Sequence, residues 1–77
     1  MPDGVPHKTL QARWESRSGK DWVALYTDRF GAVYESDNGG GNLGNLTAAQ
    51  AVAKMEAEVA TGRFQPDKAK TPMRRVV

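Results

Sequence analysis

The chain has 77 residues, a length that suits one domain and buries only about 60–65% of the unfolded surface. It contains no cysteine and a single histidine, His7, which excludes disulfide bonds and a zinc site built from thiolate and imidazole ligands. The formal net charge is +2, no apolar stretch approaches the roughly 20 residues of a membrane span, and the first residues lack a signal-peptide pattern. We therefore expect a cytoplasmic protein with no membrane partner.

The charge is distributed unevenly along the chain. Residues 1–62 contain six basic and eight acidic side chains, whereas residues 63–77 contain five basic side chains and Asp67 as the one acidic residue. The body of the chain is therefore mildly acidic and its C-terminal segment is basic, so the overall pI describes neither part.

The first half of the chain predicts an antiparallel β-meander. Residues 1–7 contain two prolines and a glycine and are expected to form a flexible leader. From Lys8 to Glu15, the residues Leu10, Ala12 and Trp14 alternate with polar residues, which is the period of a half-buried strand. Residues 22–27 and 32–35 are rich in β-branched and aromatic residues. Three such strands joined by short turns form a meander.

The turn between the second and third expected strands decides which side chains share a face. Asp28 followed by Gly31 predicts a three-residue loop with a glycine bulge, and this loop pairs Tyr26 with Tyr34. The aromatic side chains of the two strands then share one face: Trp22, Tyr26 and Tyr34. The aliphatic side chains share the other face: Val23, Leu25 and Val33. A slip of one residue would undo this assignment.

A glycine-rich segment separates the meander from a well-marked helix. Residues 37–45, with the sequence DNGGGNLGN, are predicted to form a flexible loop. Thr47 and Gln50 have the spacing of a capping box, residues 47–60 favour a helix throughout, and Gly62 is suited to end it. One stripe of this helix is apolar and should pack on the sheet: Ala48, Val52, Met55 and Val59. We expect Phe64 to close the end of the core.

These elements predict one α+β domain over residues 8–64, with a three-stranded antiparallel meander followed by one helix packed on it. Residues 65–77 contain two prolines and four Lys or Arg residues, and we expect a basic tail with few buried contacts. Met73 to Val77 is a candidate fourth strand, because Val76 and Val77 have no better reason to be apolar.

The sequence offers no arrangement of residues suited to catalysis. Gly39, Gly41 and Gly44 match the G-x-G-x-x-G pattern, but that fingerprint belongs to a parallel sheet that a chain of this length cannot supply. We therefore interpret the glycines as a connector and expect no cofactor. His7 lies in the leader, where packed neighbours cannot position it as a general base. We expect no enzymatic activity, no catalytic residue and no metal site.

The aromatic face has three explanations that the sequence leaves open. The aromatics are part of the core or are covered by another segment, they anchor a protein partner, or they stack on unpaired bases while the basic tail contacts phosphates. In either binding hypothesis the candidate residues are the same: Trp22, Tyr26, Tyr34, Lys68, Lys70, Arg74 and Arg75.

We expect a small non-enzymatic protein-interaction module whose partner is another protein. Small proteins of this kind act as adaptors, assembly factors or inhibitors of larger complexes, and accessory proteins of phages and mobile elements are examples. Binding of single-stranded nucleic acid is the alternative, although an acidic body disfavours it. Homodimerisation through a sheet edge or the aromatic face would also suit so thin a core.

Overall fold

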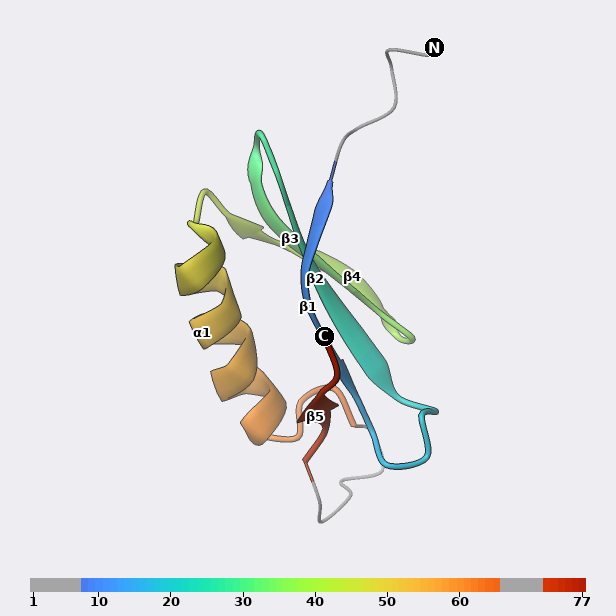
Figure 1. Cartoon of the computed structure of the whole chain (residues 1–77). Helices are drawn as coiled ribbons and strands as arrows, with labels where there is room; N and C mark the ends of the chain where they lie inside the picture. Colours follow the sequence, from blue (N-terminus) through green and yellow to red (C-terminus); the bar gives the residue numbers. More distant parts are fainter. Residues whose placement is uncertain (1–7, 66–71) are drawn as a thin grey trace, which may run out of the picture.

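Five strands and one helix follow one another in the computed structural model, which describes residues 8–65 and 72–77. The elements are β1 (Thr9–Glu15), β2 (Trp22–Asp28), β3 (Gly31–Ser36), β4 (Gly39–Gly44), α1 (Ala48–Ala60) and β5 (Arg74–Arg75). The strands form one antiparallel sheet in the order β4-β3-β2-β1-β5, and α1 lies against one face of it (Figure 1). The predicted α+β class, the meander and the packed helix are confirmed, and β4 and β5 enlarge the sheet.

The core lies between α1 and the sheet face turned toward it. From the sheet it takes every second side chain, as the alternation along a strand requires. Its buried members are Ala12, Trp14, Val23, Leu25 and Ala32 from the sheet, Ala51, Met55 and Val59 from α1, and Phe64 and Met73 from the C-terminal segments. The predicted role of Phe64 at the end of this core is confirmed.

The helix begins and ends at the predicted residues. The Thr47 hydroxyl accepts a hydrogen bond from the Gln50 N–H at 3.2 Å, and the Gln50 side-chain oxygen accepts one from the Thr47 N–H at 3.1 Å, which confirms the capping box. Gly62 has φ +81° just after the C-cap residue, the backbone conformation expected of a glycine in that position. In the described part of the chain, no helix is long and apolar enough to cross a membrane.

The buried stripe of α1 differs from the prediction by a small rotation. Met55 and Val59 are buried as expected, but Ala51 is the third buried residue of the helix. Val52 is partly buried against the core, and Ala48 is also partly exposed. The three buried residues are four positions apart, which places them along one ridge of the helix.

The predicted register between β2 and β3 is wrong by one residue. Asp28 pairs with Gly31, so the loop has two residues, and Tyr26 pairs with Val33 instead of Tyr34. Two features explain the shorter loop. The Asp28 carboxylate accepts a hydrogen bond from the Phe30 N–H at 2.7 Å. Gly31 belongs to β3 and lies against β4, where a Cβ would come within 2.3 Å of the Gly44 carbonyl oxygen.

The predicted flexible loop at residues 37–45 is also wrong, because most of it is β4. Asp37 and Asn38 form a two-residue turn, and the glycines that follow pair with β3. Their lack of side chains is what allows close pairing, since a Cβ on Gly41 would lie 2.6 Å from the Tyr34 ring. The segment thus lies in an antiparallel sheet, whereas the G-x-G-x-x-G fingerprint belongs to a parallel one.

The C-terminal segment agrees with its prediction only in part. Residues 74–75 pair with β1, so a strand within the predicted range of 73–77 is confirmed, as the fifth strand of the sheet. The expectation of few buried contacts is wrong for Met73, whose side chain is 5% exposed. Apolar contact with the core therefore accompanies the strand pairing.

Candidate interaction surface

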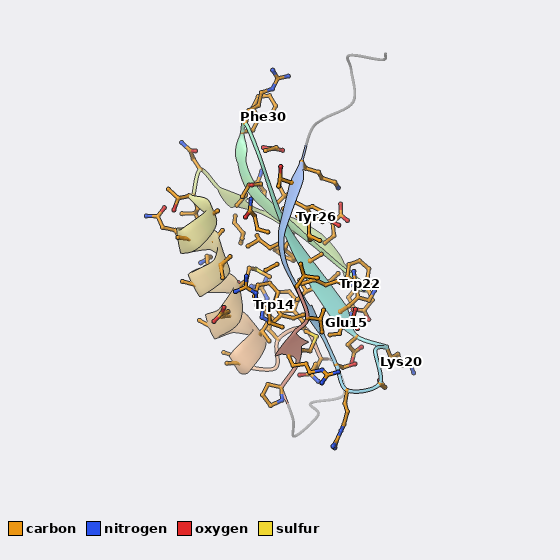
Figure 2. The ribbon with its side chains drawn as sticks, in the orientation of Figure 1. Trp14, Glu15, Lys20, Trp22, Tyr26 and Phe30 are labelled. Atoms are coloured by element: carbon orange, nitrogen blue, oxygen red, sulfur yellow. The ribbon has the colours of Figure 1, made fainter. Side chains whose placement is uncertain are left out.

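One face of the sheet is turned away from α1, and the described residues place no helix over it. Because side chains alternate along a strand, the residues between the core positions of β1, β2 and β3 point to this face. We call it the open face: Arg13, Glu15, Trp22, Ala24, Tyr26, Val33 and Glu35. Figure 2 shows Trp14 between the sheet and α1, with Trp22 and Tyr26 on the opposite side of the sheet.

Both aromatic rings of the open face are accompanied by a cation. The Arg13 guanidinium carbon lies 4.6 Å from the centre of the Trp22 ring, and the Lys8 ammonium lies 4.6 Å from the centre of the Tyr26 ring. These distances are those of cation–π interactions. The cation beside Trp22 comes from β1, and the cation beside Tyr26 comes from the residue that precedes β1. Both rings remain partly exposed.

The two cations are themselves paired with carboxylates. The Arg13 side chain donates to Glu15 at 2.8 Å, and the Lys8 ammonium donates to the Glu35 carboxylate. The hydrogen bond from Lys8 to Glu35 raises the pKa of Lys8 above its ordinary value, and the charge of Glu35 acts in the same direction. The open face therefore carries alternating charges with each cation in contact with an anion.

Ala24 shows how closely the side chains of the open face pack. It lies between Trp22 and Tyr26 on β2 and directly opposite Arg13 and Glu35 on the neighbouring strands. Although no helix among the described residues covers this position, Ala24 is 0% exposed. The larger side chains around it therefore pack over it as one layer.

A bulge in β1 adds an apolar residue beside Tyr26. Leu10 pairs with Tyr26 and Ala12 with Leu25, so β1 has one residue more than β2 over this stretch. Leu10 therefore lies on the face opposite to Ala12, which corrects the prediction that Leu10, Ala12 and Trp14 point the same way. Leu10 is 40% exposed, and with Val33 and Tyr26 it makes one end of the open face apolar.

The structure brings together only some of the sequence-predicted site residues. Trp22 and Tyr26 share the open face, but Tyr34 points to the helix side, where its ring meets Phe64 edge-on at 5.4 Å between centroids. The prediction that all three aromatics share a face is therefore wrong, and the one-residue register shift is the reason. Val33 takes the place that Tyr34 was predicted to occupy.

The basic residues of β5 point to different sides of the sheet. Arg74 is paired with Glu15 and so lies beside the open face. Arg75 is paired with Trp14, lies 6.0 Å from its ring and contacts Glu56 of α1 at 3.3 Å. Lys68 and Lys70, the other two basic candidates, lie outside the described residues.

Sequence reasoning missed the cations that accompany the aromatic rings. Arg13 occupies a polar position of a predicted strand, where the usual interpretation is a solvated side chain. A signal was present, because Arg13 and Glu15 are two residues apart on one strand and must share a face. Their position beside Trp22 follows only from the pairing of β1 with β2, which local sequence does not determine.

A cavity of about 280 Å³ lies on the helix side of the sheet. It lies between α1 and β5, with Trp14, Val59 and Met73 among its lining residues and Glu56 and Arg75 also lining it. Within the same residues no group of three or more His, Cys, Asp and Glu side chains is placed to hold a metal ion.

No protein-family model, no curated protein and no solved structure matches this chain.

Proposed function

We propose that this chain is a small protein-interaction module that binds a folded protein through its open face. The observation that carries the proposal is the pair Trp22 and Tyr26, which stay partly exposed while Arg13 and Lys8 hold their rings in place. Tryptophan, tyrosine and arginine are the residue types in which binding energy at protein interfaces concentrates. Side chains that already pack on one another, as those around Ala24 do, also lose little entropy on binding.

The same geometry disfavours single-stranded nucleic acid, the alternative function. Base stacking needs an accessible aromatic surface, but a cation already lies over each of the two rings. Those cations are paired with Glu15 and Glu35, so neither is free to neutralise a phosphate without giving up its partner. Arg74 is the remaining cation that the pairing of described strands places beside this face.

Capture of proteins from the native host on immobilised chain, followed by titration of the purified partner, tests the proposal. The Trp22→Ala variant should weaken binding by about 30-fold or more, the loss expected when a central aromatic anchor is removed. Phe30→Ala is the matched control, because Phe30 is an aromatic residue at the tip of the β2–β3 turn and is 77% exposed. Its removal should change the affinity by less than about threefold.

Folding must be separated from binding in this comparison. Far-UV circular dichroism and a denaturant midpoint for each variant show whether Trp22→Ala still folds. A partner that binds folded Trp22→Ala as tightly as the unmodified chain would refute the open face as the binding site. Filter binding with mixed-sequence oligonucleotides provides the competing test, because tight and steeply salt-dependent retention would favour the nucleic-acid alternative.

A further inference from the structure

β4 forms one outer edge of the sheet, and within the described residues no strand pairs with its second side. Ser36 and Gly39 flank a two-residue turn, so they form the hydrogen-bonded pair that closes such a hairpin. Bonded and non-bonded pairs alternate in an antiparallel ladder, so Gly40 and Asn42 direct their backbone N–H and C=O groups away from β3. The edge thus offers donors and acceptors for another strand.

The two outer edges of the sheet differ in how they are protected. β5 has only two residues, and both are arginines, which is a short and charged edge of the kind that resists pairing with another chain. β4 has six residues with the sequence GGGNLG, and it contains neither a charge nor a proline. Of the features that usually protect an edge strand, β4 has only the bulge opposite Ala32 and Val33, at its C-terminal end.

Two glycines of β4, Gly40 and Gly41, lie where a Cβ would meet β3. A Cβ on Gly40 would lie 2.6 Å from the Tyr34 carbonyl oxygen, and one on Gly41 would meet the Tyr34 ring at the same distance. Packing on β3 therefore requires glycine at position 40, and at position 41 any side chain would displace the Tyr34 ring. A consequence is that no side chain at these positions shields the outward backbone groups, and Gly40 is exposed.

We propose that the β4 edge binds β4 of a second copy of this chain, in antiparallel orientation. With the two-fold axis at Gly41, that residue faces its own copy, Gly40 faces Asn42, and Gly39 faces Leu43. The outward groups of Gly40 and Asn42 then bond to each other across the axis. In this register each of residues 39–43 meets an uncharged residue of the other β4, whereas self-pairing of β5 would oppose arginines.

The symmetry of this pairing determines the shape of the dimer. Antiparallel pairing of equivalent edges uses a two-fold axis perpendicular to the sheet. Equivalent faces of the two copies therefore lie on the same side of the joined sheet. The two α1 helices lie on one side of a continuous ten-strand sheet and the two open faces lie on the other, with β5 at each outer end. The contact uses a surface separate from the open face, and it does not depend on the function proposed for that face.

Sedimentation equilibrium over a protein concentration series tests the dimer. The 8.4 kDa chain should approach twice its mass as concentration rises. Asn42→Pro removes an outward N–H, and with it one hydrogen bond from each copy of the dimer. The monomer should tolerate proline there, because this N–H faces solvent on an edge strand. The substitution should weaken association by about tenfold or more, the loss expected for two backbone hydrogen bonds and the steric conflict with Gly40.

Asn42→Asp is a second variant that is expected to leave the hairpin intact. The Asn42 side-chain oxygen accepts a hydrogen bond from the Gly44 N–H at 2.7 Å, and aspartate keeps that acceptor. In the dimer the two added charges become diagonal neighbours about 7–8 Å apart and should weaken association severalfold, more so at low salt. Arg17→Gln changes the net charge by the same amount at an exposed position of the β1–β2 turn and should associate like the unmodified chain.

Amide hydrogen exchange supplies a readout that needs no variant. Exchange of the Gly40 and Asn42 amides should slow as protein concentration rises, while exchange of the β5 amides should stay constant. A chain that remains monomeric up to about 1 mM would overturn the proposal. Association that is unchanged in Asn42→Pro, with folding verified by circular dichroism, would also overturn it, because the contact would then lie elsewhere.

Discussion

The ammonium group of Lys8 is held at the rim of the open face by two neighbours. It lies over the Tyr26 ring and donates a hydrogen bond to the Glu35 carboxylate. Both contacts favour the charged form, and the bond to Glu35 is the largest cause of the raised pKa. The Lys8 side chain is exposed, so salt screens the interaction and its role is to position the Tyr26 ring more than to stabilise the fold.

The Glu35→Gln variant should therefore lower the pKa of Lys8 toward its ordinary value, because the carboxylate that favours the ammonium is gone. A pH titration of the lysine side chains followed by heteronuclear NMR measures this directly. Because the pKa of Lys8 is raised in the folded state, its contribution to stability is present below the ordinary lysine pKa and is lost as pH rises through the raised value. Glu15→Gln is the control and should leave the pKa of Lys8 unchanged; equal titration in both variants would contradict the Glu35 contact.

Single residues also explain why the two halves of the chain were predictable to different degrees. The capping box of Thr47 and Gln50 acts within four residues, so the sequence alone placed the start of α1 correctly. The register of β2 and β3 depends on the Asp28 carboxylate capturing the Phe30 N–H and on Gly44 approaching Gly31, and only the first of these contacts is local. Tyr34 was assigned to the wrong face for that reason.

At the scale of elements, β4 shows why strand propensity is a weak guide. Four of its six residues are glycines, which are depleted in strands, and its composition predicts a loop. It is a strand because it pairs with β3, and at Gly40 and Gly41 a Cβ would meet the Tyr34 carbonyl oxygen and the Tyr34 ring, so the reason for glycine there lies in the neighbouring strand. The open face was likewise predictable only in part: Trp22 and Tyr26 were placed on one face correctly, whereas the bulge that brings Leu10 beside them has no clear sequence signal.

The contact between β3 and β4 predicts different costs for two glycine substitutions. Gly31 and Gly19 both have positive φ, at +134° and +78°, so alanine is strained at either position. A Cβ on Gly31 would also lie 2.3 Å from the Gly44 carbonyl oxygen, whereas a Cβ on Gly19 would meet nothing within 4 Å. Gly19→Ala should cost about 1 kcal/mol from backbone strain alone, and Gly31→Ala at least about twice as much.

Urea unfolding monitored by tryptophan fluorescence compares the two glycine variants. If their m-values are equal, the difference between their midpoints measures the difference in stability. Equal losses of stability in Gly31→Ala and Gly19→Ala would mean that β4 moves away from Gly31 easily. In that case the close approach of the two strands would not be a strong constraint on the sheet.

For the whole molecule, the main question is whether the C-terminal segment belongs to the folding unit. The sequence suggested a tail outside the domain, because prolines and basic residues are frequent there. In the structure, Met73 fills the core beside α1, Arg74 and Arg75 pair with β1, and the Val76 N–H donates to the Arg13 carbonyl oxygen at 2.8 Å. The strand β1 thus contributes residues to the open face and also pairs with the C-terminal segment.

Met73→Ala should destabilise the whole fold by about 2–4 kcal/mol, because removal of a buried methionine side chain loses its transfer free energy and leaves a cavity. The loss should appear as a shift of a single cooperative transition, since a core this small has no independent part that could remain folded. Val77→Ala is the control: its side chain is 58% exposed, and its removal should cost less than about 0.5 kcal/mol. Similar midpoints for both variants in a urea titration would show that the C-terminal segment docks on a core that is complete without it, and residues 72–77 would then be an appendage of the domain.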